Sequence, residues 1–143
     1  MDTFKVEGGL KLKGEITPQG AKNEALQIIS AVLLSEEKIT ISNIPQIIDV
    51  ILLIELLEGL GVAVEKISDD TYSFQANDIN LTYCATPEYQ SKAKKIRGSV
   101  MLIGPMLARF GKAYIPKPGG DKIGRRRLDT HFLGFEELGA KVA

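Results

Sequence analysis

The residues best suited to chemistry lie between Pro118 and His131, which read Pro-Gly-Gly-Asp-Lys-Ile-Gly-Arg-Arg-Arg-Leu-Asp-Thr-His. Gly119 and Gly120 let the backbone approach a ligand closely, because no side chain blocks the way. The arginines at 125–127 offer planar donor forks that fit phosphate and carboxylate oxygens. This segment therefore predicts a site for a phosphoryl ligand, with one or two of the three arginines facing it.

Asp121 stands between these glycines and arginines, and its position alone admits three roles. It can carry a proton, hold a metal ion or form the turn, since aspartate after two glycines is ordinary turn chemistry. We expect no metal site, because the surroundings are cationic and no second carboxylate or histidine falls at ligand spacing. Asp129 and His131 can cap or orient the helix that follows.

Two further cations stand at the starts of expected helices. Lys22 lies where a strand gives way to a helix, so that free N–H groups and the positive helix end face any ligand there. Asn23 adds a donor and an acceptor beside it. Arg97 begins a second such helix after a run of lysines. For both cations, a solvated surface side chain is the alternative interpretation.

The elements that must position these residues are short strands and helices in alternation. Helical patterns cover 21–34, 47–60, 98–110 and 128–138, and the first and third are apolar on nearly every side, as in buried helices. Pro105 predicts irregular geometry early in the third. Strand patterns cover 4–6, 10–16, 38–41, 62–67, 72–75, 79–82 and 112–115, and Val142 is expected to open another strand.

An internal repeat relates the two halves of this pattern. The helix and strand over 22–41 match those over 97–116, which gives Lys22 and Arg97 equivalent positions. Both cations point to one pocket if the two units pack about a common axis. Because the chain stops where the second unit should enter its closing strands, we expect an amino-terminal piece of a larger repeat protein.

Composition limits the classes of function. The chain has 143 residues, 44% hydrophobic and 25% charged, which suits one globular domain. Eighteen basic residues balance 18 acidic ones, so no global field favours nucleic acid or an anionic membrane. Cys84 is the single cysteine, and we find neither a secretion signal nor a membrane-spanning stretch. We expect a cytoplasmic protein with no cofactor, nucleic acid or membrane partner.

At three motifs, 20–26, 97–99 and 118–131, the chain resembles the UDP-N-acetylglucosamine 1-carboxyvinyltransferase family. The resemblance implies an α/β fold of the enolpyruvyl-transferase type. This is an inside-out barrel of repeated βαβαββ units with helices inside and sheets outside, of which only the first one to two units are present. It also implies that residues 1–20 complete the second domain of the full enzyme and that residues 21–143 form a partial first domain.

The resemblance implies transfer of the enolpyruvyl group of phosphoenolpyruvate to the 3-hydroxyl of UDP-N-acetylglucosamine, with release of phosphate, the first committed step of peptidoglycan precursor synthesis. Lys22 would hold phosphoenolpyruvate, with Asn23 beside it at the junction with the sugar nucleotide. Arg126 would reach the phosphate of phosphoenolpyruvate as well. The remainder of the same polypeptide would supply the general base. The sugar-nucleotide site would be lined by Arg97, Arg126, Arg127, Leu128, Asp129 and Thr130.

Asp121 falls where most members of that family carry a cysteine that donates a proton, and some members carry aspartate. A carboxyl group has a reference pKa of about 3.9, so it donates at neutral pH only if burial or bound anions raise that pKa. A carboxylate is also a poor nucleophile. We therefore expect resistance to the epoxide antibiotic fosfomycin, which alkylates the cysteine. Arg127 replaces the proline common at its position.

Two alternatives stay open. Shikimate-3-phosphate enolpyruvyl transferase shares the fold and a lysine near the start, although the segment 118–131 fits the sugar-nucleotide enzyme better. A non-catalytic anion-binding repeat module is favoured if the chain is complete as given. We expect this piece to be inactive by itself.

Overall fold

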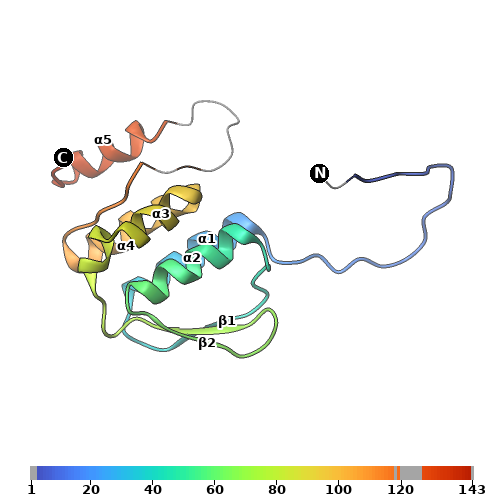
Figure 1. Ribbon diagram of the computed structural model, residues 1–143, viewed down its shortest axis with the longest axis horizontal. Helices are drawn as coiled ribbons and strands as arrows, with labels where there is room; N and C mark the ends of the chain where they lie inside the picture. Colours follow the sequence, from blue (N-terminus) through green and yellow to red (C-terminus); the bar gives the residue numbers. More distant parts are fainter. Residues whose placement is uncertain (1–2, 118, 120–126, 143) are drawn as a thin grey trace.

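The computed structural model describes residues 3–117, 119 and 127–142, and in it a small sheet is followed by two successive layers of helices (Figure 1). The amino-terminal segment runs away from these layers as an extended stretch of chain. Helix α5 (Asp129–Glu137) lies at the opposite side, beyond the second helical layer.

The sheet forms one outer face of the molecule. Its three strands are β1 (Ile39–Ile41), β2 (Ala63–Lys66) and β3 (Tyr72–Gln75). Their order is β1-β3-β2, and β3 pairs antiparallel with both neighbours. Phe74 lies opposite Ile39 on one side and Val64 on the other, and it is fully buried. This register turns the apolar side chains of the sheet toward the helices.

The first helical layer consists of α1 (Lys22–Ala31), which continues as the 3₁₀ turn η1 (Val32–Leu34), and α2 (Ile48–Gly59). The two helices pack against each other, and Ile29, Leu53 and Leu57 between them are fully buried or nearly so. Gly61 ends α2 with a φ of 100°, a conformation that a side chain rarely adopts.

The second helical layer consists of η2 (Leu81–Ala85), α3 (Pro87–Lys95), η3 (Arg97–Leu102) and α4 (Ile103–Phe110). Helix α3 begins where the Thr86 hydroxyl accepts a hydrogen bond from the N–H of Tyr89 at 3.2 Å. The Tyr89 ring is fully buried, and its hydroxyl donates to the carbonyl oxygen of Tyr114 at 3.1 Å. The bond to Tyr114 ties α3 to the chain that follows α4, and α3 also packs on α2.

The four predicted helices are confirmed as α1 with η1, α2, η3 with α4, and α5. The prediction of irregular geometry near Pro105 is confirmed too, because the 3₁₀ turns of η3 precede it. The prediction that α1 is buried on all sides is wrong for this chain. Its residue Ile28 is 44% exposed and Leu34 of η1 is 53% exposed, because the described layers cover only one side of them.

Of the predicted strands, those over 38–41, 62–67 and 72–75 are confirmed as β1, β2 and β3. The strands expected over 4–6, 10–16 and 112–115, and the one expected to open at Val142, do not form within the described residues. A strand needs a paired neighbour, and among those residues no segment pairs with them. The segment 79–82 leads into η2 instead, because the Asn80 side chain accepts a hydrogen bond from the N–H of Thr82 at 3.0 Å.

Helix α3 was not predicted from the sequence. Its buried residues are Tyr89 and Ala93, four positions apart, and the rest of the helix is polar. So narrow an apolar stripe is a weak helical signal, although Thr86 and Pro87 together are typical of a helix start.

Candidate functional site

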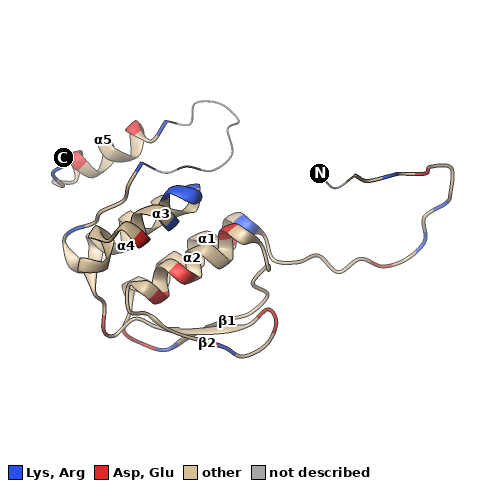
Figure 2. Cartoon of the chain, in the orientation of Figure 1, with Lys and Arg blue, Asp and Glu red and all other residues tan. Residues whose placement is uncertain are grey.

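A cleft of about 780 Å³ lies where α1, α2 and η3 begin. Lys22 and Asn23 reach it from α1, Asp49 from α2 and Arg97 from η3. Lys95 lines it from the end of α3. Figure 2 shows the basic start of α1 and the basic end of α3 at the same end of the helical layers.

Lys22 forms an ion pair with Asp49 across the cleft wall, with 2.9 Å between Nζ and Oδ2. The Lys22 side chain is 42% exposed and that of Asp49 is 32% exposed, so water screens the attraction. An anion that enters the cleft therefore competes with Asp49 for the ammonium group. Sequence analysis did not single out Asp49, because an acidic residue in the first turn of a helix is common for reasons of helix stability alone.

The start of α1 is held by a close contact between Gly20 and Asn43. The N–H of Gly20 donates to Oδ1 of Asn43 at 3.1 Å, and Asn43 has a φ of 58°. A Cβ at position 20 would lie 2.0 Å from the carbonyl oxygen of Asn43, so glycine is required there. Among the described residues no side chain caps α1, so the N–H groups of its first turn have no side-chain acceptor there.

Arg97 lies on the other side of this cleft, at the start of η3. Next to it, Gly98 packs directly against Leu26 of α1, and a Cβ at position 98 would approach the Leu26 methyl groups to 3.0 Å. The two repeat units thus touch right beside the two cations. The structure brings Lys22 and Arg97 to one cleft, as the repeat predicted.

The basic run before Arg97 divides between two faces. Lys92 forms ion pairs with Glu88 at 3.1 Å and Glu55 at 3.2 Å. Its hydrogen bonds to Glu88 and to Glu55 raise the pKa of Lys92. Lys94 is exposed, whereas Lys95 lines the cleft. Lys94 therefore belongs to a solvated basic face, whereas Lys95 is in a position to meet a ligand in the cleft.

The structure describes only part of the segment 118–131, which contains the clustered arginines. Asp121, Arg125 and Arg126 lie outside the described residues. Gly119 passes so close to α3 that a Cβ there would lie 1.9 Å from the carbonyl oxygen of Lys94. The close backbone approach predicted for this glycine is therefore made to the protein itself, beside the cleft-lining Lys95.

The residues after the arginine cluster lead into α5, and Leu128 and His131 line the cleft. Arg127 and Asp129 pair with each other, with 2.7 Å between Nε and Oδ2. Arg127, Asp129 and Thr130 are exposed and stand next to the cleft-lining residues without lining the cleft. Sequence analysis gave His131 only a capping or orienting role, since an isolated histidine carries no spacing signal for a ligand.

The lining combines charge with apolar surface. Among the described residues, the cations Lys22, Lys95 and Arg97 and one carboxylate, that of Asp49, line the cleft, and Leu52 and Met101 add apolar surface. Such a lining fits an anionic ligand that also has a non-ionic part. Within the described part of the chain, no group of three or more His, Cys, Asp and Glu side chains could hold a metal ion. In the same part, no helix has both the length and the apolar character to span a bilayer.

Comparison with known proteins identifies the family to which the chain belongs. Residues 6–143 match the profile described as EPSP synthase (3-phosphoshikimate 1-carboxyvinyltransferase). UDP-N-acetylglucosamine 1-carboxyvinyltransferase of Bacteroides thetaiotaomicron is 60% identical over 140 residues, which cover 98% of this chain and 32% of that protein. The protein of the same name from Porphyromonas gingivalis is 55% identical over the same shares. The one from Treponema denticola is 46% identical over 99% of this chain and 32% of its own length.

The chain thus spans about a third of the length of these curated relatives. Among solved structures, the enolpyruvyl transferase NikO from Streptomyces tendae is similar with a TM-score of 0.53 and 21% identity, over 73% of this chain and 23% of that one. At this identity the likeness concerns the fold alone. It confirms the predicted α/β fold of the enolpyruvyl-transferase type, of which this chain holds a part.

Proposed function

Because the chain belongs to the EPSP synthase family, we propose that the protein containing it is a carboxyvinyl transferase acting on a sugar nucleotide. It transfers the enolpyruvyl group of phosphoenolpyruvate to the 3-hydroxyl of UDP-N-acetylglucosamine and releases phosphate, as a step of peptidoglycan precursor synthesis. The observation that carries this proposal is the shared cleft of Lys22 and Arg97, cations at equivalent helix starts of two repeat units. The names of relatives up to 60% identical support the choice of acceptor.

Lys22 holds phosphoenolpyruvate in this proposal, and Asn23 lies at the junction with the sugar nucleotide. The free N–H groups at the start of α1 and the ammonium of Lys22 favour a phosphate there. The sugar nucleotide takes the side of the cleft formed by Arg97 and Leu128. Its remaining contacts come from Arg126, Arg127, Asp129 and Thr130, which belong to the same segment as Leu128.

The chemistry needs a proton donor and a base. In the addition step the sugar oxygen bonds to carbon 2 of phosphoenolpyruvate, carbon 3 gains a proton, and the hydroxyl proton passes to the base. In the elimination step the bond from carbon 2 to the phosphate oxygen breaks and carbon 3 loses a proton, which restores the double bond. We assign proton donation to Asp121 and the base to the rest of the polypeptide.

Substrate binding decides whether Asp121 can act as an acid. The neighbouring cations favour the ionised carboxylate, which cannot donate. Two bound substrates bring phosphate and diphosphate charge that neutralises those cations and raises the pKa of the carboxyl group. The same cations then stabilise the negative charge of the departing phosphate.

The placement of the first residues supports a second domain. Phe4 is 93% exposed and Leu12 is 97% exposed, although both are apolar. We propose that residues 1–20 complete the second domain of the full enzyme and that residues 21–143 form a partial first domain. We place the enzyme in the cytoplasm, where the free, buried thiol of Cys84 stays reduced.

Phosphate release by the full-length protein tests the function. We expect release from phosphoenolpyruvate with UDP-N-acetylglucosamine and none with shikimate 3-phosphate, the acceptor of the alternative enzyme. Asp121→Asn keeps the shape of the side chain but has no proton to give, so turnover should fall by about 100-fold or more. Binding of UDP-N-acetylglucosamine by this variant, measured by calorimetry, should stay close to that of the unaltered protein.

Release with shikimate 3-phosphate instead of the sugar nucleotide would identify the alternative enzyme. Binding of both substrates by the unaltered full-length protein without any release would identify a non-catalytic anion-binding module.

A further inference from the structure

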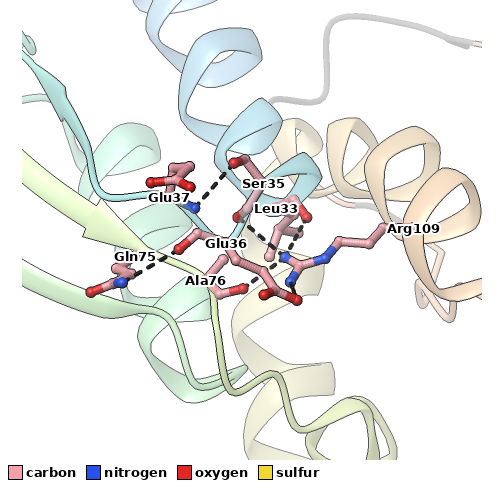
Figure 3. A network of polar contacts seen from close by, with 7 residues as sticks. All are labelled: Leu33, Ser35, Glu36, Glu37, Gln75, Ala76 and Arg109. Carbon is pink, nitrogen blue, oxygen red and sulfur yellow. Dashed lines mark hydrogen bonds and ion pairs between the residues drawn. The ribbon is translucent and has the colours of Figure 1, made fainter.

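Arg109, near the end of α4, makes the most extensive set of polar contacts of any side chain in Figure 3. Its side chain is only 16% exposed. Nη1 lies 2.9 Å from the carbonyl oxygen of Leu33, 3.2 Å from that of Ser35 and 2.7 Å from that of Ala76. Nη2 forms an ion pair with Glu36 at 3.0 Å.

The three carbonyl groups all need such a donor. Those of Leu33 and Ser35 stand at the end of η1, where the last carbonyls of a helix have no partner within the helix. That of Ala76 directly follows β3. Nη1 shares its two N–H groups among these three carbonyl oxygens, and the planar fork directs Nη2 to Glu36 at the same time, so one ammonium nitrogen cannot take both places.

Every one of these contacts joins the two repeat units. Arg109 belongs to the second unit, and its partners Leu33, Ser35 and Ala76 lie 76, 74 and 33 positions away in the first. Within the first unit, the turn that receives Arg109 is itself held in place. The N–H of Glu37 donates to the Ser35 hydroxyl at 3.1 Å, and the Gln75 amide donates to the carbonyl oxygen of Glu36 at 3.4 Å (Figure 3).

These contacts lie at the opposite end of the helices from the cleft. The stretch formed by α1 and η1 begins with Lys22 in the cleft and ends at the Arg109 contacts, and the stretch formed by η3 and α4 begins with Arg97 in the cleft and ends there too. The two stretches pack side by side, with η3 on α1 and α4 on η1. Near the cleft, the contact between Gly98 and Leu26 is a second fixed point.

The apolar packing along the two stretches has no fixed direction, whereas the directed contacts of Arg109 at one end and the close packing of Gly98 on Leu26 at the other set the angle between them. If the Arg109 contacts were lost, the stretch carrying Arg97 could turn about the contact between Gly98 and Leu26. Lys22 and Arg97 would then vary in separation, although neither touches Arg109 in the described structure. A misplacement of about 1 Å can cost about 100-fold in an enzyme that works by positioning.

We propose that Arg109 is a positioning residue for the cleft, which acts by holding the second repeat unit at a set angle to the first and so sets the separation of Lys22 and Arg97. The kinetic part of this inference rests on the proposed function. The structural part does not, because it concerns the distance between two helices.

The kinetic experiment uses the full-length protein with three variants. Arg109→Met keeps the stem of the side chain and removes every donor, and Arg109→Lys keeps the charge but loses the planar fork. Glu36→Gln is the matched control, because it removes only the ion pair with a carboxylate that is 75% exposed and leaves the three carbonyl contacts. We expect Arg109→Met to raise KM for both substrates by about tenfold with a smaller fall in kcat, Arg109→Lys to lie between, and Glu36→Gln to match the unaltered protein.

A measurement without substrate separates this inference from the function. Spin labels on cysteines at Glu24 of α1 and Met101 of η3, both exposed, report the distance between α1 and η3. Native Cys84 is buried and takes no label. We expect a broader distribution of label distances in Arg109→Met, and the unaltered distribution in Glu36→Gln.

A lower melting temperature in Arg109→Met, combined with unchanged KM values and an unchanged label distribution well below that temperature, would show a stabilising role alone and overturn the proposal. If Arg109→Met does not fold, Arg109→Lys decides by the same two readouts. Absence of turnover in the unaltered full-length protein would refute the proposed function, and the label distances would still decide the role of Arg109.

Discussion

In the proposed function, Lys22 binds its ligand in competition with Asp49. The two side chains are 2.9 Å apart and both are about a third or more exposed. A pair so open to water contributes only about 0 to 1 kcal/mol to stability, so the net attraction that holds Lys22 to Asp49 is small. A phosphoryl group approaching the start of α1 offers more charge and also the N–H groups of the helix end. Asp49 therefore keeps Lys22 at the cleft wall without blocking an anion.

The aspartate at position 121 leads to a prediction about the reaction of the protein with fosfomycin. In the full-length protein we expect no covalent adduct with fosfomycin, because a carboxylate is a weak nucleophile toward an epoxide. Asp121→Cys should form one adduct per chain, since a thiolate among cations is both abundant and reactive. Intact-protein mass spectrometry after incubation measures the adduct. Stoichiometric modification of the unaltered protein at Asp121 would contradict the prediction.

At the scale of the elements, the helices α2 and α4 are each followed by a glycine, and the surroundings of the two glycines differ. Gly61 follows α2 with a φ of 100°, and a Cβ there would lie 2.2 Å from the carbonyl oxygen of Asp78. Gly111 ends α4 with a φ of 68°, and nothing lies within 4 Å of the corresponding Cβ. The two positions share an unfavourable backbone conformation for other residues, but only Gly61 is also enclosed.

This difference predicts unequal costs for the same substitution. Gly111→Ala should lower the free energy of unfolding by about 1 to 2 kcal/mol, because alanine is strained at positive φ. Gly61→Ala should cost clearly more, since backbone atoms near Asp78 must also move. Urea unfolding of the two variants and the unaltered chain gives the comparison. Equal shifts in the midpoint would show that the close contact at Gly61 has no energetic effect.

In the molecule as a whole, the described residues divide into a packed body, the helix α5 beyond it and an extended amino-terminal segment (Figure 1). Leu12 is 97% exposed and Ile16 is 93% exposed, whereas Gly20 is bonded to Asn43. The free energy of folding of the body therefore has no contribution from burial of these apolar side chains.

Deletion of residues 1–18 should accordingly change the free energy of unfolding by less than about 0.5 kcal/mol. The midpoint of urea unfolding should therefore stay the same. The deletion keeps Gly20 and its hydrogen bond to Asn43. Binding of an apolar dye should fall at the same time, because exposed apolar residues are removed. A lower midpoint after deletion would mean that the segment packs on the body in solution.

The amino-acid sequence by itself determined those features that depend on neighbours along the chain. Apolar spacing predicted α1, α2 and α5, and Gly61 and Gly111 lie where helices end. The internal repeat paired Lys22 with Arg97 because equivalent positions in a repeat occupy equivalent places in space.

Only the tertiary structure decided which distant residues lie beside Lys22 and Arg97 in the cleft. Asp49, Lys95 and His131 line the cleft because separate helices begin or end at the same place. Arg109 finds acceptors up to 76 positions away. Strands were predicted poorly over 4–6, 10–16 and 112–115 for the same reason. A helix satisfies its own backbone, whereas a strand, a cleft and a bridging side chain exist only through segments that the packed fold brings together.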